Sequence, residues 1–210
     1  MKQIDFDHGT VTGNILGVAL PMLVAQILSL LYNIVDRIYI ARIPSVGTTA
    51  LGAVGLCFPI IVIITAFSNL FGSGGAPLFS INRGKGNIKK AEAIMNTSFS
   101  MLCICGVTLM VIGMLFASPI LVLFGASEEG LSYAYPYMMI YLIGTVPSMI
   151  ATGMNPFINA QGYATSGMLS VTIGAVANLI LDPLFIFGLN LGIKGAAIAT
   201  IISQTLSAAY

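Results

Sequence analysis

The chain has 210 residues, and only 15 of them are formally charged: eight Lys or Arg and seven Asp or Glu, 7% of the sequence. Soluble domains carry about 25% charged residues, whereas here 57% of residues are hydrophobic and the mean hydropathy is +0.98. This composition excludes a soluble enzyme, a disordered segment and a nucleic-acid binder, which would need a basic patch. It predicts an all-α, polytopic membrane protein, because lipid offers the backbone no hydrogen-bond partners and the alternating pattern of membrane strands is absent.

Six apolar segments are candidates for membrane spans, each of which takes about 20 residues. They cover residues 14–41, 50–82, 94–118, 135–157, 166–187 and 193–210. No linker or low-complexity stretch divides them, so we expect one transmembrane domain over residues 1–210, built as a six-helix bundle. The second segment is too long for one straight span, so we expect it to tilt or to extend beyond the membrane near Asn82.

The basic residues predict the orientation of the bundle. Four of them lie in the connection after the second segment: Arg83, Lys85, Lys89 and Lys90. The connection after the third segment has Glu128 and Glu129 and no base. By the positive-inside rule the first of these connections is cytoplasmic. The N-terminus, with Lys2, is then cytoplasmic too, in a multi-pass protein of the inner (plasma) membrane.

Polar residues recur on one helical face of three segments. These are Gln26, Ser29, Asn33 and Asp36 in the first, Tyr141, Thr145, Ser148, Thr152 and Asn155 in the fourth, and Ser170, Gly174, Asn178 and Asp182 in the fifth. Because lipid disfavours such groups, we expect all three faces to point into the bundle. Ser, Thr and Asn there either join helices by hydrogen bonds or line a substrate cavity, for which we single out Gln26, Asn33, Tyr141, Thr145, Ser148 and Thr152.

Asp36 and Asp182 differ from these neutral residues, because a carboxylate within a span costs about 2.5–3.5 kcal/mol on insertion scales and usually marks an ion or proton pathway. Both acids lie towards the outer ends of their segments, and Asn178 lies one helical turn before Asp182. Asp36 has an alternative role, as the ion-pair partner of the adjacent Arg37 or as an interfacial residue. Asp182 has no base beside it in the sequence.

Two backbone features bear on movement and packing. Pro21 lies inside the first segment, where it removes a helical hydrogen bond and permits a bend, so we predict a hinge there. The run GSGGAP, residues 72–77, lacks the Lys-Ser or Lys-Thr pair of a phosphate loop. We interpret it as a site of close helix packing.

Three stretches resemble the multidrug and toxic compound extrusion (MATE) transporters. NLILDPLFIFGLNLGIKGAAIAT, residues 178–200, resembles the signature of their fifth and sixth helices. ALPMLVAQILSLLYNIVDRIYIA, residues 19–41, is similar to their first helix, with its proline and its acid at matching places. GSGGAPLFSINRGKGNIKKAE, residues 72–92, resembles their connection between the second and third helices. The family has twelve helices in two lobes, so we expect this chain to be the N-terminal lobe, truncated in its sixth helix, with a second six-helix lobe as its partner.

The resemblance implies a secondary-active antiporter in the lipid bilayer that exports cationic or amphipathic organic molecules in exchange for Na⁺ or H⁺. It implies no enzyme activity and no cofactor besides the coupling ion. The family's cation site carries over as Asp36, Asn178, Asp182 and Thr200. Their oxygens are the ligands that a hard cation prefers, and the carboxylates could equally hold a proton, since burial disfavours their charged form. The sequence leaves Na⁺ and H⁺ open.

Other functions have weaker support in the sequence. An intramembrane aspartyl protease could use Asp36 and Asp182, but such enzymes place the second acid in Gly-x-Gly-Asp, and here the run is Leu-Ile-Leu-Asp. A rhomboid-like protease needs a His within the membrane, and the one histidine is His8. A lipid-intermediate flippase would need basic residues in its cavity, where only Arg37 is available. A fragment without activity of its own is compatible with the same fold.

Overall fold

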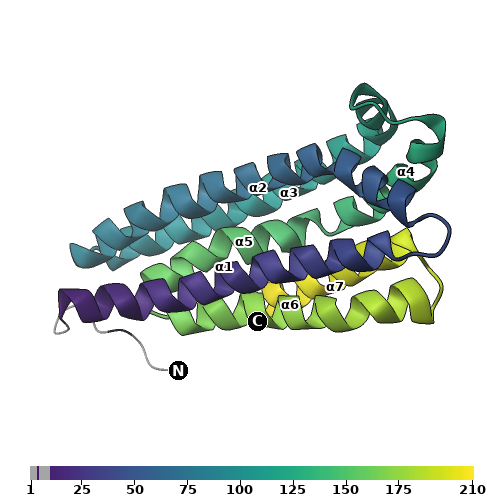
Figure 1. Cartoon of the computed structure of the whole chain (residues 1–210). Helices are drawn as coiled ribbons and strands as arrows, with labels where there is room; N and C mark the ends of the chain where they lie inside the picture. The colour runs from purple at the N-terminus through teal and green to yellow at the C-terminus, as the bar shows by residue number, and fades with distance from the viewer. Residues whose placement is uncertain (1–3, 5–9) are drawn as a thin grey trace.

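The computed structural model describes residue 4 and residues 10–210, and in this part of the chain the protein is a bundle of long helices without strands (Figure 1). The elements are α1 (Val11–Ala41), α2 (Gly47–Gly84), α3 (Ile88–Leu123), α4 (Glu128–Ile143), α5 (Thr145–Ala160), α6 (Ala164–Pro183), the π-helical turn η1 (Leu184–Gly188) and α7 (Ile193–Ala209). Because α4 and α5 together form the fourth segment and η1 continues α6, the six predicted helical segments are confirmed. Lys2 and His8 lie outside the described residues.

Four helical segments are long and apolar enough to cross a membrane: α1, α2, α3 and α6 with η1. The α4–α5 pair makes a fifth if the two helices are counted as one span. Helix α7 has 17 residues, which at about 1.5 Å per residue is slightly shorter than a hydrocarbon core of about 30 Å. The bundle therefore has the lengths and the composition of a multi-pass membrane protein.

The fourth segment differs from the single straight span that the sequence predicted. The chain breaks at Gly144, and α4 and α5 meet there at an angle of 56°. Helix α7 approaches this point closely, since a β-carbon on Gly144 would lie 2.7 Å from Ile201 Cγ1. Pro147 lies in the first turn of α5, where the missing backbone N–H of proline costs little. The break separates Tyr141 on α4 from Thr145, Ser148, Thr152 and Asn155 on α5.

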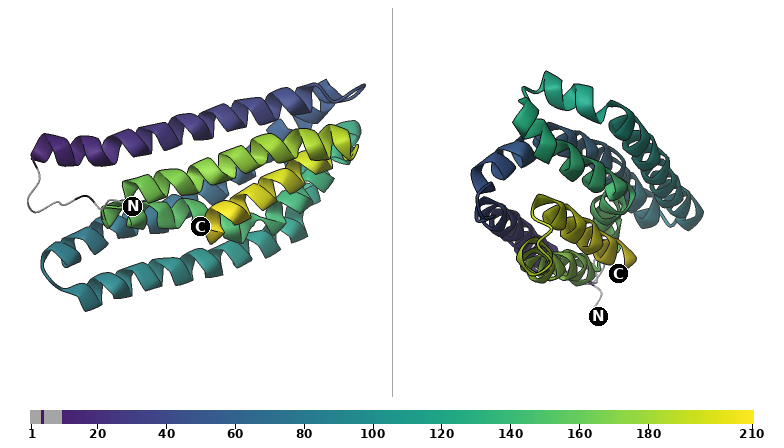
Figure 2. Two further views of the ribbon diagram at one scale, coloured as in Figure 1. Left: turned by 90° about the horizontal axis from the view of Figure 1, so that it is seen from below. Right: turned by 90° about the vertical axis from the view of Figure 1, so that its right-hand side faces the viewer.

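The helices alternate in direction, so that their connections gather at the two ends of the bundle (Figures 1 and 2). The start of α1, the α2–α3 turn and the α5–α6 turn lie at one end, where the Ile4 N–H donates to the Gly162 carbonyl over 3.0 Å. We call this the basic end, because it carries the four bases of residues 83–90. The α1–α2, α3–α4 and α6–α7 connections lie at the opposite end. Helix ends are fixed by polar caps, such as Asn87, whose Oδ1 accepts from the Lys90 N–H at the start of α3.

Glycines allow α2 to pack closely against α3 and α5. A β-carbon on Gly72 would collide with the Gly153 carbonyl oxygen of α5. One on Gly75 would lie 2.5 Å from Ser98 Oγ and 2.8 Å from the Phe157 ring. This confirms that the glycine-rich run serves helix packing.

Helix α1 has a different environment from the other long helices. It packs mainly along α6 and diverges from α2 (Figure 2). Ile40 is its one buried residue among those described. The helix is continuous through Pro21. The predicted hinge therefore lies within a helix that packs mainly against one neighbour, α6.

Candidate functional site

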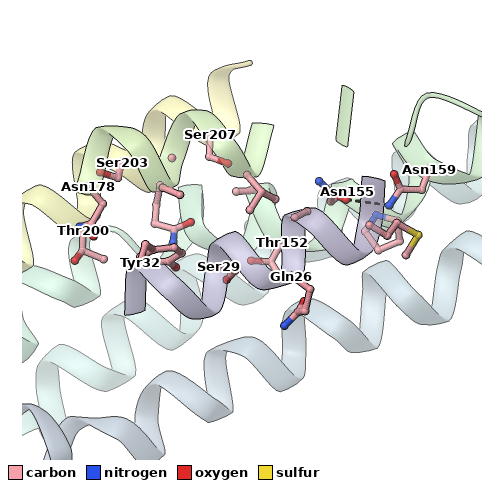
Figure 3. Close-up of a pocket in the computed structure, with 18 residues that line it drawn as sticks. Gln26, Ser29, Tyr32, Thr152, Asn155, Asn159, Asn178, Thr200, Ser203 and Ser207 are labelled. Carbon is pink, nitrogen blue, oxygen red and sulfur yellow. Dashed lines mark hydrogen bonds between the residues drawn. The ribbon is translucent and has the colours of Figure 1, made fainter. Parts of the chain in front are cut away.

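A polar cavity of about 250 Å³ lies between α1, α5, α6 and α7 (Figure 3). We call it the central cavity. Helices α1, α5 and α7 each contribute several polar side chains to its wall, and α6 contributes Asn178. The polar residues that line it are Gln26, Ser29, Tyr32, Thr152, Asn155, Asn159, Asn178, Thr200, Ser203, Gln204 and Ser207.

The predicted cavity residues divide into two groups. Two of them line the central cavity, Gln26 and Thr152, and four do not: Asn33, Tyr141, Thr145 and Ser148. Asn33 is exposed, contrary to the prediction that its face points inward, and its Nδ2 donates to the Ser29 carbonyl over 2.7 Å. Thr145 is fully buried. The break at Gly144 separates Tyr141 from α5, whereas Thr145 and Ser148 lie in the first turn of α5, before the residues from Ala151 onward that line the cavity.

Several cavity residues were not singled out from the sequence. Three lie on α7, Ser203, Gln204 and Ser207, and with Thr200 they recur at helical spacing on one face. The same spacing in the sequence could have predicted this polar face of α7. Asn159 and Tyr32 complete the set and extend the polar faces of α5 and α1.

Asp36 and Asp182 meet between α1 and α6. Their carboxyl groups lie within hydrogen-bonding reach of each other. An ionised carboxylate can only accept hydrogen bonds, so such a bond requires a proton on one of the two groups. On the same face of α6, Asn178 Nδ2 donates to Asp182 Oδ1 over 3.1 Å. The structure therefore brings together the two predicted acids and the predicted amide.

Oxygen atoms at this acid pair remain without hydrogen-bond partners although they are buried. They are Asp36 Oδ1, Asp182 Oδ2 and Asn178 Oδ1. Thr200, the fourth predicted ligand, lies beside Asn178 in the cavity wall (Figure 3), and its hydroxyl donates to the Ala196 carbonyl over 2.9 Å, which leaves its oxygen lone pairs available. Unpaired carboxylate, amide and hydroxyl oxygens suit a hard monovalent cation or a proton. Among the described residues no third acid, Cys or His joins the pair.

Arg37 does not take the role of a partner for Asp36. Its guanidinium lies over the ring of Phe58 on α2, 5.6 Å from the centroid, in a cation–π arrangement. Asp36 Oδ1 meanwhile has no hydrogen-bond partner. The geometry favours the acid pair over the ion pair that the sequence left as an alternative.

Comparison with known proteins agrees with this arrangement. Residues 21–184 match the family described as MatE. The FAD transporter of Shewanella oneidensis is 31% identical over 93% of this chain and 44% of its own length. The multidrug export protein MepA of Staphylococcus haemolyticus is 28% identical over 98% of this chain and 45% of its own length.

A solved structure of a multidrug resistance MATE family transporter of the MOP superfamily, in an outward-facing conformation, superposes with a TM-score of 0.88. Its sequence identity is 27%, and the match covers 96% of this chain and 44% of the solved chain. The chain thus spans less than half the length of the curated relatives described above. With a family match over most of its residues, this chain belongs to the MATE family of membrane transporters.

Proposed function

We propose that this chain is one lobe of a secondary-active exporter, in which Asp36 and Asp182 bind the coupling ion and the central cavity receives part of the substrate. The observation that carries the proposal is the close approach of two carboxyl groups inside the bundle, beside three buried oxygens that have no hydrogen-bond partner among the described residues. Buried polar atoms normally have partners. An ion or a proton that comes and goes accounts for both features.

Ion occupancy can bias the conformation of the lobe. When the ion leaves, two like charges remain close together in a medium of low dielectric constant, where their repulsion is strong. A state that separates α1 from α6 relieves this repulsion, and a state that joins them is favoured when the ion binds. A ligand shifts such an equilibrium only as far as it binds one state better than the other. Bending of α1 at Pro21 is the movement we propose for this switch.

The substrates we propose are organic cations and amphipathic molecules, and the similarity to the multidrug export protein MepA supports export of drug-like compounds. The lining of the central cavity, as far as the structure describes it, has amides, hydroxyls and the Tyr32 ring but no Lys or Arg. An anionic substrate such as the FAD of the Shewanella relative, or a lipid-linked phosphate, would need basic groups there. A cation would instead be attracted by the acid pair at the end of the cavity.

The complete transporter, in this proposal, has a second six-helix lobe, because its relatives are about twice as long as this chain. The substrate path would run between the two lobes. We propose further that the protein lies in the inner (plasma) membrane with the basic end in the cytoplasm. The four bases of residues 83–90 support this orientation.

The test is export from vesicles that contain the transporter assembled with its second lobe. Vesicles are loaded with a fluorescent organic cation, and an opposing gradient of either H⁺ or Na⁺ is imposed. We expect one of the two gradients to drive the cation against its own gradient, and we expect an ionophore for that ion to abolish the effect. Export that responds to neither gradient would contradict secondary-active transport.

A further inference from the structure

A second cavity, of about 1140 Å³, opens at the basic end between α1, α2 and α5. We call it the basic-end cavity. Its wall includes Val18 of α1 and Ser80 and Arg83 of α2. It shares two residues of α5 with the central cavity, Pro156 and Asn159. Among the described residues these two are the ones that line both cavities, and we call them the partition.

Asn159 is held in this partition with an unused oxygen. It is only 9% exposed, and its Nδ2 donates to Asn155 Oδ1 over 3.0 Å. Asn155 is fixed in turn, because its Nδ2 donates to the Gly167 carbonyl over 2.9 Å and to Ser170 Oγ over 3.2 Å. Asn159 Oδ1 has no hydrogen-bond partner among the described residues. A buried acceptor without a partner costs about 1–3 kcal/mol, so this amide is ordered for something other than packing.

The unpaired oxygen of Asn159 is one of a series. Asn178 Oδ1 and Ser203 Oγ line the same cavity and are also buried without partners. Asp36 and Asp182 follow beyond Asn178. Figure 3 shows Asn178 and Asn159 towards opposite ends of the cavity, with Ser203 on the side of Asn178. The unpaired acceptors thus extend from the acid pair towards the basic end.

Pro156 adds to the polarity of the partition. It lacks a backbone N–H, so helix α5 cannot form the hydrogen bond from residue 156 to the Thr152 carbonyl. Thr152 and Pro156 both line the central cavity. Oxygens that lack donors from the protein are suited to water and to cations, which water carries through polar cavities.

We propose that Asn159 is the gating residue of a cation path that leads from the Asp36–Asp182 pair through the central cavity into the basic-end cavity. The species that passes is a hydrated monovalent cation or a proton carried on water. Arg83 on the wall of the basic-end cavity disfavours a cation that stays there, and so promotes its release to solvent. This inference rests on the proposed function and adds to it the route by which the coupling ion leaves.

The test measures how fast a small cation reaches the central cavity from the basic end. Cys57, Cys103 and Cys105 are replaced by Ala, and Ser203→Cys places one thiol in the cavity wall. Ag⁺, a monovalent cation that binds thiols, is applied to the basic end of vesicles in which the protein has one orientation. The rate is read as loss of later labelling by a fluorescent maleimide.

Two substitutions of Asn159 should change this rate in opposite directions. Asn159→Ala removes the side chain from the partition and should raise the rate by about tenfold, whereas Asn159→Leu fills it with an apolar group and should lower the rate by about as much. Asn82→Leu is the matched control, since Asn82 donates to the Leu78 carbonyl on α2 and lines neither cavity. Its rate should equal that of the parent. Equal rates in the Ala, Leu and parent proteins would overturn the path.

A third variant keeps the test decisive if Asn159→Leu does not fold, as judged by its thermal unfolding midpoint. Asn159→Asp has nearly the same shape and adds a negative charge. It should raise the rate for Ag⁺ and leave the rate for neutral methyl methanethiosulfonate unchanged. A rate for Ag⁺ that stays at the parent value would overturn the role of Asn159.

The labelling assay needs no transport, so it separates this inference from the proposed function. If gradient-driven export occurs but the labelling rate is the same in all Asn159 variants, the cation path is wrong and the proposed function stands. Labelling that responds to Asn159 in a protein without gradient-driven export would support the connection between the cavities and overturn ion-coupled transport.

Discussion

Asp36 of α1 and Asp182 of α6 bring their carboxyl groups within hydrogen-bonding reach of each other, although they come from the first and the fifth helical segments of the chain. Helix α1 reaches Asp182 because it packs mainly along α6. Ile40 is its one buried residue among those described. Helix α1, which packs mainly against α6, therefore carries one of the two acids. An ion bound between the acids would hold α1 against α6.

The first prediction concerns Pro21. Spin labels at Val11 and Ile88, both exposed at the basic end, should change their separation when Na⁺ is added or the pH is lowered, because the ion favours one bend of α1. Labels at Leu70 of α2 and Ile104 of α3, both exposed, serve as the control pair and should keep their separation, because neither lies on α1. An unchanged Val11–Ile88 distance distribution would remove the hinge from the mechanism.

The second prediction concerns Asn178, whose Nδ2 donates to Asp182 Oδ1. Asn178→Ala removes a hydrogen bond to a buried carboxylate, which is worth about 1.5–3 kcal/mol. If Na⁺ is the coupling ion, we expect the Na⁺ concentration for half-maximal export to rise by about tenfold or more, since 1.4 kcal/mol corresponds to a factor of ten. If H⁺ is the coupling ion, loss of this donor favours the protonated carboxyl group, and the H⁺ concentration for half-maximal export should fall instead. Asn33→Ala, at an exposed residue that bonds to its own helix, should leave this concentration unchanged. Equal ion dependence in both variants would mean that Asn178 does not support the ion site.

The third prediction compares two neighbouring glycines of α2. Gly72→Ala forces a methyl group against the Gly153 backbone and should destabilise the bundle by about 1–3 kcal/mol. Gly74→Ala has no atom within 4 Å of its β-carbon and should be neutral or stabilising by about 0.5–1 kcal/mol, because alanine favours the helix. Thermal unfolding midpoints in detergent compare the two. A midpoint for Gly72→Ala at or above that of Gly74→Ala would refute close packing at this crossing.

The fourth prediction concerns orientation. In a protein without Cys57, Cys103 and Cys105, single cysteines at Lys89 and Glu128 report on the two ends of the bundle, and both positions are exposed. An impermeant maleimide added outside intact cells should label position 128 and not position 89. The reverse pattern would invert the topology, and with it the direction of the proposed cation path.

Helical periodicity predicted most of the fold and part of the site. The spacing of Asn178 and Asp182 placed them on one face of α6, and the depth of Asp36 matched that of Asp182, so the acid pair followed from the sequence. The break at Gly144 did not, because it depends on the approach of Ile201 from α7, a contact between distant parts of the chain. Tyr141 precedes this break, and Thr145 lies in the first turn of α5, before the residues from Ala151 onward that line the cavity.

The prediction that Asn33 points into the bundle was wrong for a related reason. Its spacing from Ser29 is helical, but the same helix carries exposed polar groups as well as buried ones, and periodicity does not say which neighbour covers a face. The polar face of α7 was missed, although Thr200, Ser203 and Ser207 recur at intervals of three and four residues. Asn159 could not have been identified from spacing, because its importance comes from two cavities that the folded chain places on either side of it.

The most direct test of the acid pair is gradient-driven export by Asp182→Asn in the transporter assembled with its second lobe. This substitution preserves the shape of the side chain and its capacity for hydrogen bonds, but it removes the group that gains and loses charge. Glu92→Gln, at an exposed acid of α3, is the control for loss of a negative charge. We predict that Asp182→Asn inserts and binds the organic cation but loses export driven by H⁺ or Na⁺, while Glu92→Gln keeps it. Export by Asp182→Asn at the parent rate across a series of pH values and Na⁺ concentrations would show that the acid pair does not couple the ion to transport.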